Sequence, residues 1–231
     1  RDGSKSLYGC SYCNNNSFRP DYCTPELTIA QQIDRGVRFF AGKYPKMRFL
    51  AYFQSYSNTY GSIDLLDKLY SEALAHEAID GLVIATRPDC VNDEILDLIA
   101  DTARKSFVLV EYGIESTLNR TLAAINRQHT YQDAILAIEA TKMRGIHTGA
   151  HLILGLPGES KDEMLEHAAA LSKLPLDTLK LHHLQIIRNT SFATIYKSQP
   201  GYFRLFGCDE YVDMVVQFLE RLHPSIALDR F

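Results

Sequence analysis

The chain has 231 residues, of which 46% are hydrophobic, so it is long enough to bury a substantial core as one large domain or two small ones. Its formal net charge of −4 argues against a surface that binds polyanions in general, and no apolar run is long enough to predict a membrane span. The five cysteines are sparse and odd in number, which favours a reducing compartment such as the cytoplasm over a disulfide framework.

Helix-forming and strand-forming segments alternate between residue 24 and about residue 187. Residues that cap a first turn mark the helix starts: Thr24 before Pro25, Ser62, Asn92, Thr130 with Asp133, and Ser160 with Glu163. These signals predict helices over 24–40, from 62, from 92, over 131–144 and over 160–172. Apolar and β-branched runs predict strands over 47–53, 81–85, 107–111, 151–155 and 178–182.

The predicted strands end near residues 54, 86, 111, 151 and 182, and the steps between them are close to the length of one βα unit. This repetition predicts an α/β fold with a parallel sheet. Parallel sheets place ligands at the carboxyl ends of their strands, where this sequence gathers polar residues: Gln54, Asn58, Thr86, Arg87, Asp89, Glu111, Glu115, His151, Glu159, His182, His183 and Gln185. No Gly-x-Gly-x-x-Gly follows a predicted strand, which disfavours a dinucleotide-binding Rossmann domain.

Cys10 and Cys13 form a Cys-x-x-Cys pair with an aromatic residue, Tyr12, just before the second cysteine. Taken alone, the pair is consistent with half of a zinc site, a redox dithiol, part of an iron–sulfur site or two buried small residues. Cys23 is a candidate third ligand, although no histidine lies nearby in the sequence. Cys90 and Cys208 are interpreted as structural.

Three further features are candidates for function. Glu111 follows the apolar run Phe-Val-Leu-Val, where a carboxylate without a partner is costly. The turn from Gly155 to Glu159 contains two glycines that allow close backbone approach, although a tight turn alone explains them equally. His182 and His183 are neighbours on a predicted strand, so their side chains point to opposite faces and one is assigned to the core.

Several motifs together resemble a known family. They are Asp2-Gly3, Gly9-Cys-Ser-Tyr-Cys-Asn-Asn15, Tyr52-Phe-Gln-Ser-Tyr-Ser-Asn-Thr-Tyr60, Thr86-Arg-Pro-Asp-Cys90, Ile125-Asn-Arg127 with His129, and Ala150-His-Leu-Ile-Leu-Gly-Leu-Pro-Gly-Glu159. The chain resembles the YhcC-like branch of the radical SAM superfamily, whose members are relatives of the radical SAM domain of the Elongator catalytic subunit. This resemblance covers essentially the whole chain and implies one radical SAM core domain over residues 1–231 that is incomplete at both ends. The expected fold is a partial (β/α)6-type barrel whose first strand lies before Arg1.

The resemblance implies two cofactors, a [4Fe-4S] cluster and S-adenosylmethionine (SAM). Three thiolates hold such a cluster and leave one iron open for the amine and carboxylate of SAM. Cys10 and Cys13 correspond to two of the ligands, and the third is expected upstream of Arg1 in a Cys-Pro-Asn segment. At the more usual spacing stands Ser6, which cannot replace a thiolate. The implied activity is reductive cleavage of SAM to a 5′-deoxyadenosyl radical, which abstracts hydrogen from an unidentified substrate, with a reductant such as flavodoxin or ferredoxin.

The resemblance also implies roles for individual residues. Tyr12 lies beside the adenine, Gln54 takes the place of the motif that binds the methionyl amine, Glu111 hydrogen-bonds the ribose, and Arg127 binds the SAM carboxylate. The backbone around Leu154 and Leu156 lines the adenine, while Thr86, Arg87, His151 and His182 are candidates for the substrate side.

Three other functions stay open at this point. The first is a nucleic-acid or protein-binding module in which Cys10, Cys13 and another ligand hold structural zinc. The second is a non-catalytic barrel that keeps SAM as a stabilising ligand. The third is action on tRNA, which the relationship to the Elongator subunit suggests. The 28 acidic residues against 24 lysines and arginines favour a small molecule as the substrate instead.

Overall fold

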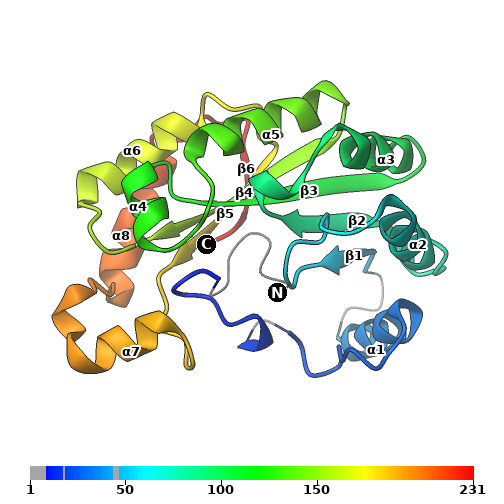
Figure 1. Cartoon of the computed structure of the whole chain (residues 1–231), viewed down its shortest axis with the longest axis horizontal. Helices are drawn as coiled ribbons and strands as arrows, with labels where there is room; N and C mark the ends of the chain where they lie inside the picture. Colours follow the sequence, from blue (N-terminus) through cyan, green and yellow to red (C-terminus); the bar gives the residue numbers. More distant parts are fainter. Residues whose placement is uncertain (1–8, 18, 44–46) are drawn as a thin grey trace.

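Six parallel strands form one curled sheet in the computed structural model, which describes residues 9–17, 19–43 and 47–231. The strands are β1 (Phe49–Phe53), β2 (Ile79–Thr86), β3 (Phe107–Glu115), β4 (His147–Leu154), β5 (Thr178–His183) and β6 (Ala227–Arg230), and they pair in sequence order. The sheet curls into a half-barrel, so the predicted α/β partial barrel is confirmed (Figure 1). The Asp2-Gly3 motif and Ser6 lie outside the described residues.

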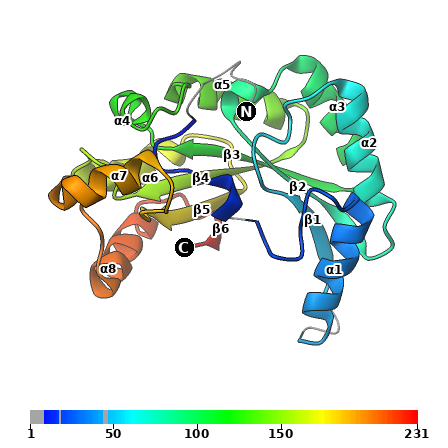
Figure 2. The ribbon, with the colours of Figure 1, turned by 60° about the horizontal axis from the view of Figure 1, so that its bottom comes forward.

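Eight α-helices accompany the strands within the described residues. They are α1 (Ile29–Ala41), α2 (Ile63–Leu74), α3 (Asp93–Ala103), α4 (Asn119–Ala124), α5 (Tyr131–Met143), α6 (Lys161–Leu171), α7 (Ser191–Ser198) and α8 (Cys208–Leu219). Of these, α2, α3, α5, α6 and α8 pack on the outer face of the curl. Figures 1 and 2 show α2, α3 and α5 on one face of the sheet and the N-terminal segment on the other. None of the helices in the described part of the chain is both long and apolar enough to cross a membrane.

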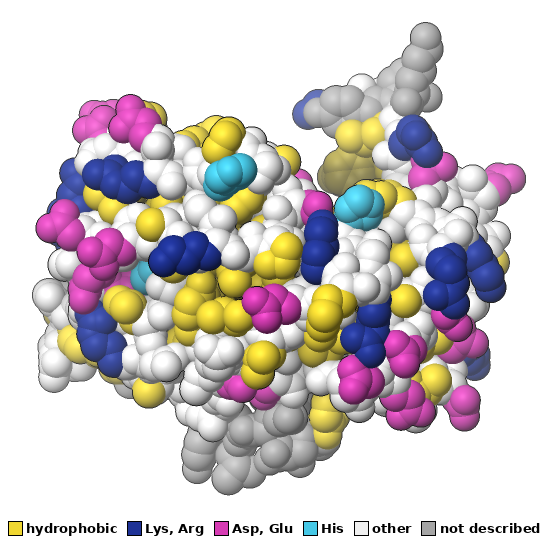
Figure 3. All heavy atoms as spheres, turned by 90° about the horizontal axis from the view of Figure 1, so that it is seen from above, with side chains coloured by type: hydrophobic (Ala, Val, Ile, Leu, Met, Phe, Trp, Pro, Cys, Tyr) yellow, Lys and Arg dark blue, Asp and Glu magenta, His cyan; other side chains and the backbone are white. Residues whose placement is uncertain are grey.

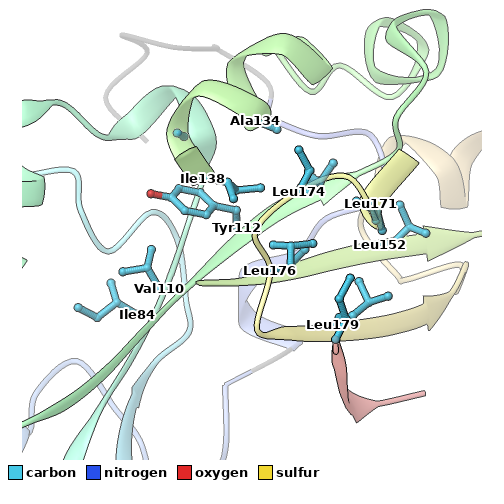
Figure 4. Close-up of a cluster of buried hydrophobic side chains, with 14 of the residues drawn as sticks. Ile84, Val110, Tyr112, Ala134, Ile138, Leu152, Leu171, Leu174, Leu176 and Leu179 are labelled. Atoms are coloured by element: carbon cyan, nitrogen blue, oxygen red, sulfur yellow. The ribbon is translucent and has the colours of Figure 1, made fainter. Parts of the chain in front are cut away.

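The main hydrophobic core lies between the sheet and these helices. Along β3, Val108, Val110, Tyr112 and Ile114 point outward into this core, as the two-residue period of a strand requires. Figure 4 shows the core, in which Tyr112 and Ile138 lie next to each other. The same cluster includes Leu171, Leu174, Leu176 and Leu179 from the C-terminal half of the chain. The Tyr112 hydroxyl is buried and lies 2.7 Å from Thr141 Oγ1 on α5. The alternate residues of β3, including Glu111, Gly113 and Glu115, therefore face the inside of the curl.

Local capping signals located most helix starts correctly, and one was wrong. Ser62, Asn92, Thr130 and Ser160 are N-caps, as predicted. The first helix begins at Ile29 and not after Thr24, because the Thr28 side chain and Gln31 form a reciprocal capping box. Thr24 instead accepts a backbone hydrogen bond from Leu27 in a turn that precedes the helix.

Two strand boundaries differ from the prediction and change the position of the site. β3 continues to Glu115 and β4 begins at His147, so Glu111 and His151 lie inside their strands, and the prediction that they end them is wrong. The charge at Glu111 does not end β3, because Lys180 and His151 compensate it on the inner face. The elements after residue 187 were not predicted, and the short strand β6 adds to the sheet beside β5.

Candidate active site

A cavity of about 820 Å³ occupies the inside of the curled sheet. The N-terminal loop, the ends of the strands and the segment after β5 all contribute to its walls. Of the twelve residues given a metal, cofactor or substrate role from the sequence, nine line it: Cys10, Tyr12, Cys13, Gln54, Thr86, Arg87, Arg127, His151 and His182. The structure therefore brings together residues that are as far apart in the chain as Cys10 and His182.

Hydrogen bonds to two distant segments hold the loop that carries Cys10 and Cys13. The Ser11 amide donates to the Ile125 carbonyl at 3.0 Å, and the Ser11 carbonyl accepts from the Phe192 amide at 3.0 Å. The Asn126 side-chain amide donates to the Gly9 carbonyl at 2.6 Å. The two thiols are consequently fixed at the mouth of the half-barrel, next to the end of α4 and the start of α7.

Arg127 connects the thiol loop to the sheet. Its side chain is 8% exposed, and Nη1 lies 3.4 Å from Cys10 Sγ. Nη2 donates to the Gly113 carbonyl and lies 3.2 Å from Glu115 Oε1, while Nε donates to His129 Nε2 at 3.0 Å. Burial and the charge of Arg127 lower the pKa of His129, so the ring stays neutral and accepts this hydrogen bond.

Glu115 is a site residue whose importance the sequence did not reveal. It stands at the end of β3, in the left-handed region with a φ of 70°, where the register with β4 shifts. The side chain is 11% exposed and lines the cavity. A Cβ on Gly113 would lie 2.4 Å from Arg127 Nη2 and 2.6 Å from Glu115 Oε1, so only glycine leaves room for this ion pair. The sequence pattern marks Glu115 only as one of several polar residues near a strand end.

The predicted adenine region is apolar. Tyr12 packs against a second hydrophobic cluster that contains Ile153 and Leu156. The side chain of Leu154 belongs to the main core on the other face of the sheet, and neither Leu154 nor Leu156 lines the cavity. Gly155 has a φ of 87°, which favours glycine in the turn that follows β4.

Gln54, Thr86 and Arg87 lie at the carboxyl ends of β1 and β2, as predicted. The Thr86 hydroxyl is 2.6 Å from Thr59 Oγ1, which ties the end of β2 to the loop after β1. Arg87 binds Asp89 with two hydrogen bonds of 2.8 Å each, so its guanidinium is held in one orientation at the cavity wall.

Glu111 lies on the inner face below the cavity, 1% exposed, and is not one of the cavity-lining residues. Its carboxylate accepts hydrogen bonds from Lys180 Nζ at 2.7 and 2.9 Å and lies 2.9 Å from His151 Nε2. Burial would raise the pKa of Glu111, but hydrogen bonds and charge from His151 and Lys180 outweigh burial and lower the pKa to about 2. The carboxylate that reaches the cavity is thus that of Glu115.

Lys180 is a second site residue that was not predicted from the sequence. Its ammonium also pairs with Asp229 Oδ2 of β6 at 2.9 Å and lies 4.5 Å from the centroid of the Tyr52 ring. The alternation Thr-Leu-Lys-Leu-His along β5 places Lys180 and His182 on one face, and that pattern was a usable signal.

His182 and His183 make different contacts, as expected for neighbours on a strand, but neither is fully buried, so the prediction that one belongs to the core is wrong. The His182 ring contacts the His151 ring, with centroids 5.5 Å apart, whereas His183 contacts Tyr211 of α8. Burial lowers the pKa of His182 to about 4. His182 is therefore neutral near pH 7 and faces the cavity as an uncharged polar group.

Comparisons with known proteins decide the family. Residues 7–171 match the family model of the radical SAM superfamily, and residues 176–231 match the radical SAM C-terminal domain. The chain belongs to the radical SAM superfamily. The family that the sequence motifs suggested is thereby confirmed.

Individual relatives agree with this membership. Protein YhcC of Escherichia coli strain K12 is 33% identical over 231 residues, covering 100% of this chain and 73% of that protein. An uncharacterized protein of Methanocaldococcus jannaschii, MJ0486, is 33% identical over 226 residues, covering 96% of this chain and 69% of the relative. Among solved structures, Methanocaldococcus infernus Elp3 with an N-terminal deletion has a TM-score of 0.73 at 17% identity, covering 87% of this chain and 51% of that one. This chain thus spans about half of the Elp3 chain, and that likeness concerns the fold.

Two thiols of the described chain fit the ligand set of a radical SAM cluster. Cys10 and Cys13 lie on one anchored loop and both line the cavity. No group of three or more His, Cys, Asp or Glu side chains that could bind a metal occurs within residues 9–17, 19–43 and 47–231. Cys23 is described, and it does not join the pair. A complete site for structural zinc is likewise absent from those residues.

Proposed function

We propose that this radical SAM protein is an enzyme that cleaves SAM reductively and uses the radical to act on a small molecule held in the cavity. When bound, the cluster supplies one electron to the sulfonium of SAM, which gives methionine and a 5′-deoxyadenosyl radical that abstracts a substrate hydrogen. The observation that carries the proposal is the anchored cysteine loop at the mouth of the cavity, with Cys10 Sγ 3.4 Å from Arg127 Nη1. A reductant such as flavodoxin or ferredoxin would deliver the electron.

The proposed cofactor roles follow the positions of the side chains. Cys10 and Cys13 would hold the cluster together with a thiolate from sequence that precedes Arg1 in similar proteins. Arg127 would bind the SAM carboxylate, and Gln54, at the end of β1, the methionyl amine. Glu115 faces the cavity and Glu111 does not, which favours Glu115 over Glu111 as the partner of the ribose hydroxyls.

The adenine would lie against Tyr12 and the turn after β4. Tyr12 and Leu156 belong to one apolar cluster, and the main chain around Leu154 to Leu156 follows the end of β4. An apolar wall with a few backbone groups suits a flat, partly polar base, and it excludes water from the reacting sulfonium.

Thr86, Arg87, His151 and His182 would face the substrate, which we propose to be a small molecule rather than tRNA. The cavity volume of about 820 Å³ lies within the range of small-molecule sites, roughly 300 to 1,000 Å³. RNA binding would call for a continuous basic surface. Figure 3 shows lysines and arginines interspersed with acidic residues on the face seen from above.

The test is anaerobic reconstitution of the protein with iron and sulfide, followed by measurement of 5′-deoxyadenosine after reduction with dithionite. We expect bound iron with acid-labile sulfide and 5′-deoxyadenosine that depends on SAM. Cys13→Ala should lose both, whereas Cys208→Ala, a matched control at an exposed cysteine outside the cavity lining, should keep both.

Two results would overturn the proposal in different ways. One zinc per chain without sulfide would support the zinc-stabilised binding module. A stable iron–sulfur protein that binds SAM and forms no 5′-deoxyadenosine under reducing conditions would support a non-catalytic SAM-binding barrel.

A further inference from the structure

Three side chains from neighbouring strands form a hydrogen-bonded group on the inner face of the sheet. Glu111 is on β3, His151 on β4 and Lys180 on β5. His151 is level with Lys180 in the strand register, and both donate to the Glu111 carboxylate, His151 Nε2 at 2.9 Å and Lys180 Nζ at 2.7 Å. Of the three, His151 and Lys180 line the cavity, and Glu111 lies behind them.

The hydrogen bond to Glu111 fixes which nitrogen of the His151 ring is left for a ligand. Because Glu111 is ionised between two cation-forming partners, its carboxylate only accepts, so His151 Nε2 carries the hydrogen. Nδ1 of the neutral ring then has a lone pair. Within the described residues Nδ1 has no hydrogen-bond partner. Among those residues, the Tyr211 hydroxyl is the one fully buried side-chain nitrogen or oxygen without a partner, so His151 Nδ1 is not fully buried. Nδ1 is therefore open to the cavity.

The other titratable groups around His151 already have partners within the protein. Lys180 on β5 pairs with both Glu111 and Asp229 of β6. His182, also on β5, stacks edge-on against the His151 ring, and burial lowers its pKa to about 4. Glu111 faces His151 from β3. Within this group and the described residues, His151 Nδ1 is the ring nitrogen that remains available to a ligand.

We propose that His151 is the proton acceptor for the substrate, which therefore carries a hydroxyl or ammonium group, and that Glu111 and Lys180 position its ring. In the step, the O–H or N–H bond of the substrate breaks, its electron pair stays on that oxygen or nitrogen, and a new N–H bond forms at Nδ1. The imidazolium keeps its Nε2 hydrogen on the Glu111 carboxylate, which stabilises the added charge. This inference rests on the proposed function, because it names the substrate chemistry of the same cavity.

The chain contains a second histidine–glutamate pair, His167 with Glu159, in which the histidine is buried and both ring nitrogens have partners. The His167 side chain is 1% exposed, and its two nitrogens are both engaged, Nδ1 with Thr117 Oγ1 at 2.7 Å and Nε2 with Glu159 Oε2 at 3.3 Å. The His151 side chain is 17% exposed, and none of the residues that the structure describes is bonded to its Nδ1. His167 is thus a matched internal control for the reactivity of His151.

The first experiment treats the full-length holoenzyme anaerobically with diethylpyrocarbonate, which acylates an unprotonated, accessible imidazole nitrogen, and maps the modified histidines by peptide mass spectrometry. We expect His151 to react at least an order of magnitude faster than His167, both with and without SAM. Equal rates, or complete protection of His151 by SAM alone, would overturn the proposal, since His151 would then be sealed or occupied by the cofactor. The outcome is independent of SAM cleavage, so it separates this inference from the proposed function.

The second experiment observes the tautomer by NMR of protein labelled with 15N in its histidine rings. The neutral His151 ring should carry its hydrogen on Nε2, and Glu111→Gln should shift the population toward the other tautomer, because the glutamine amide no longer requires a donor. Asp101→Asn, an exposed change on α3, is the control and should leave the spectrum of His151 unchanged. A hydrogen on Nδ1 in the wild type, or no change in Glu111→Gln, would overturn the positioning role.

Discussion

Replacing Glu111 by glutamine should lower the stability of the fold and remove part of its pH dependence. Burial, opposed and outweighed by His151 and Lys180, sets the pKa of Glu111 at about 2 instead of the ordinary 4.5. At about 1.4 kcal/mol for each pH unit, this difference corresponds to about 3 kcal/mol of folding free energy. Because the side chain is 1% exposed, solvent screening reduces this value little.

The lowered pKa of Glu111 determines the pH range over which this carboxylate stabilises the fold. The pKa is lower in the folded chain than in the unfolded one, so the contribution is complete above a pH of about 4.5 and is lost as the pH falls toward about 2. Glu111→Gln lacks this titration. At neutral pH the variant should lose about 3 kcal/mol, the lower end for breaking a buried ion pair, because Lys180 keeps its contact with Asp229.

Urea unfolding followed by far-UV circular dichroism at a series of pH values measures both effects. The wild-type free energy of unfolding should fall more steeply than that of Glu111→Gln as the pH is lowered through the window set by the two pKa values. Asp101→Asn, which removes an exposed carboxylate, should change stability by less than about 0.5 kcal/mol. Parallel pH profiles for the wild type and Glu111→Gln would refute the reasoning, since Glu111 would then titrate as it does in the unfolded chain.

Three further predictions concern the site, the core and the substrate. Gly113→Ala forces Arg127 and Glu115 to move, so isothermal titration of the reconstituted protein should show SAM binding weakened by about 1.5 to 3 kcal/mol with the cluster retained. Tyr112→Phe should cost about 1 kcal/mol in urea unfolding, because the Thr141 hydroxyl keeps its bond to a main-chain carbonyl. Binding of tRNA to the full-length protein should be weak and nonspecific, and submicromolar, length-dependent affinity with a steep salt dependence would contradict the small-molecule proposal.

Local signals in the sequence determined much of the fold. The caps at Ser62, Asn92, Thr130 and Ser160 act within one helical turn, and each is an N-cap in the structure. The parallel direction of β1 to β5 followed from the spacing of apolar runs, since strands joined by helices in βα units run parallel. The position of the cysteine pair at the cavity mouth followed from family resemblance, because no local pattern links residue 10 to residue 127.

The parts that could not be read from the sequence depend on contacts between distant segments. Glu111 resembled a strand end because a charge followed four apolar residues, yet Lys180 and His151 reach it only through the register of three strands. Asp229 enters the same group through β6, whose short polar sequence gives no strand signal. The left-handed backbone at Glu115 likewise arises from the register shift between β3 and β4.

The inner face of β3 explains how one strand carries two buried carboxylates. Strands of a parallel sheet are commonly apolar on both faces, and an unpaired charge there is strongly unfavourable. In this sheet each carboxylate has its own cation, Lys180 for Glu111 and Arg127 for Glu115. Gly113, between them, has no side chain, so the Arg127 guanidinium fits beside Glu115 without displacing the Lys180–Glu111 pair. The Arg127–Glu115 pair contacts the cysteine loop, and the Lys180–Glu111 pair orients His151. Substitutions at Glu111 or Lys180 should therefore alter proton transfer from the substrate and leave Cys10 and Cys13 in place.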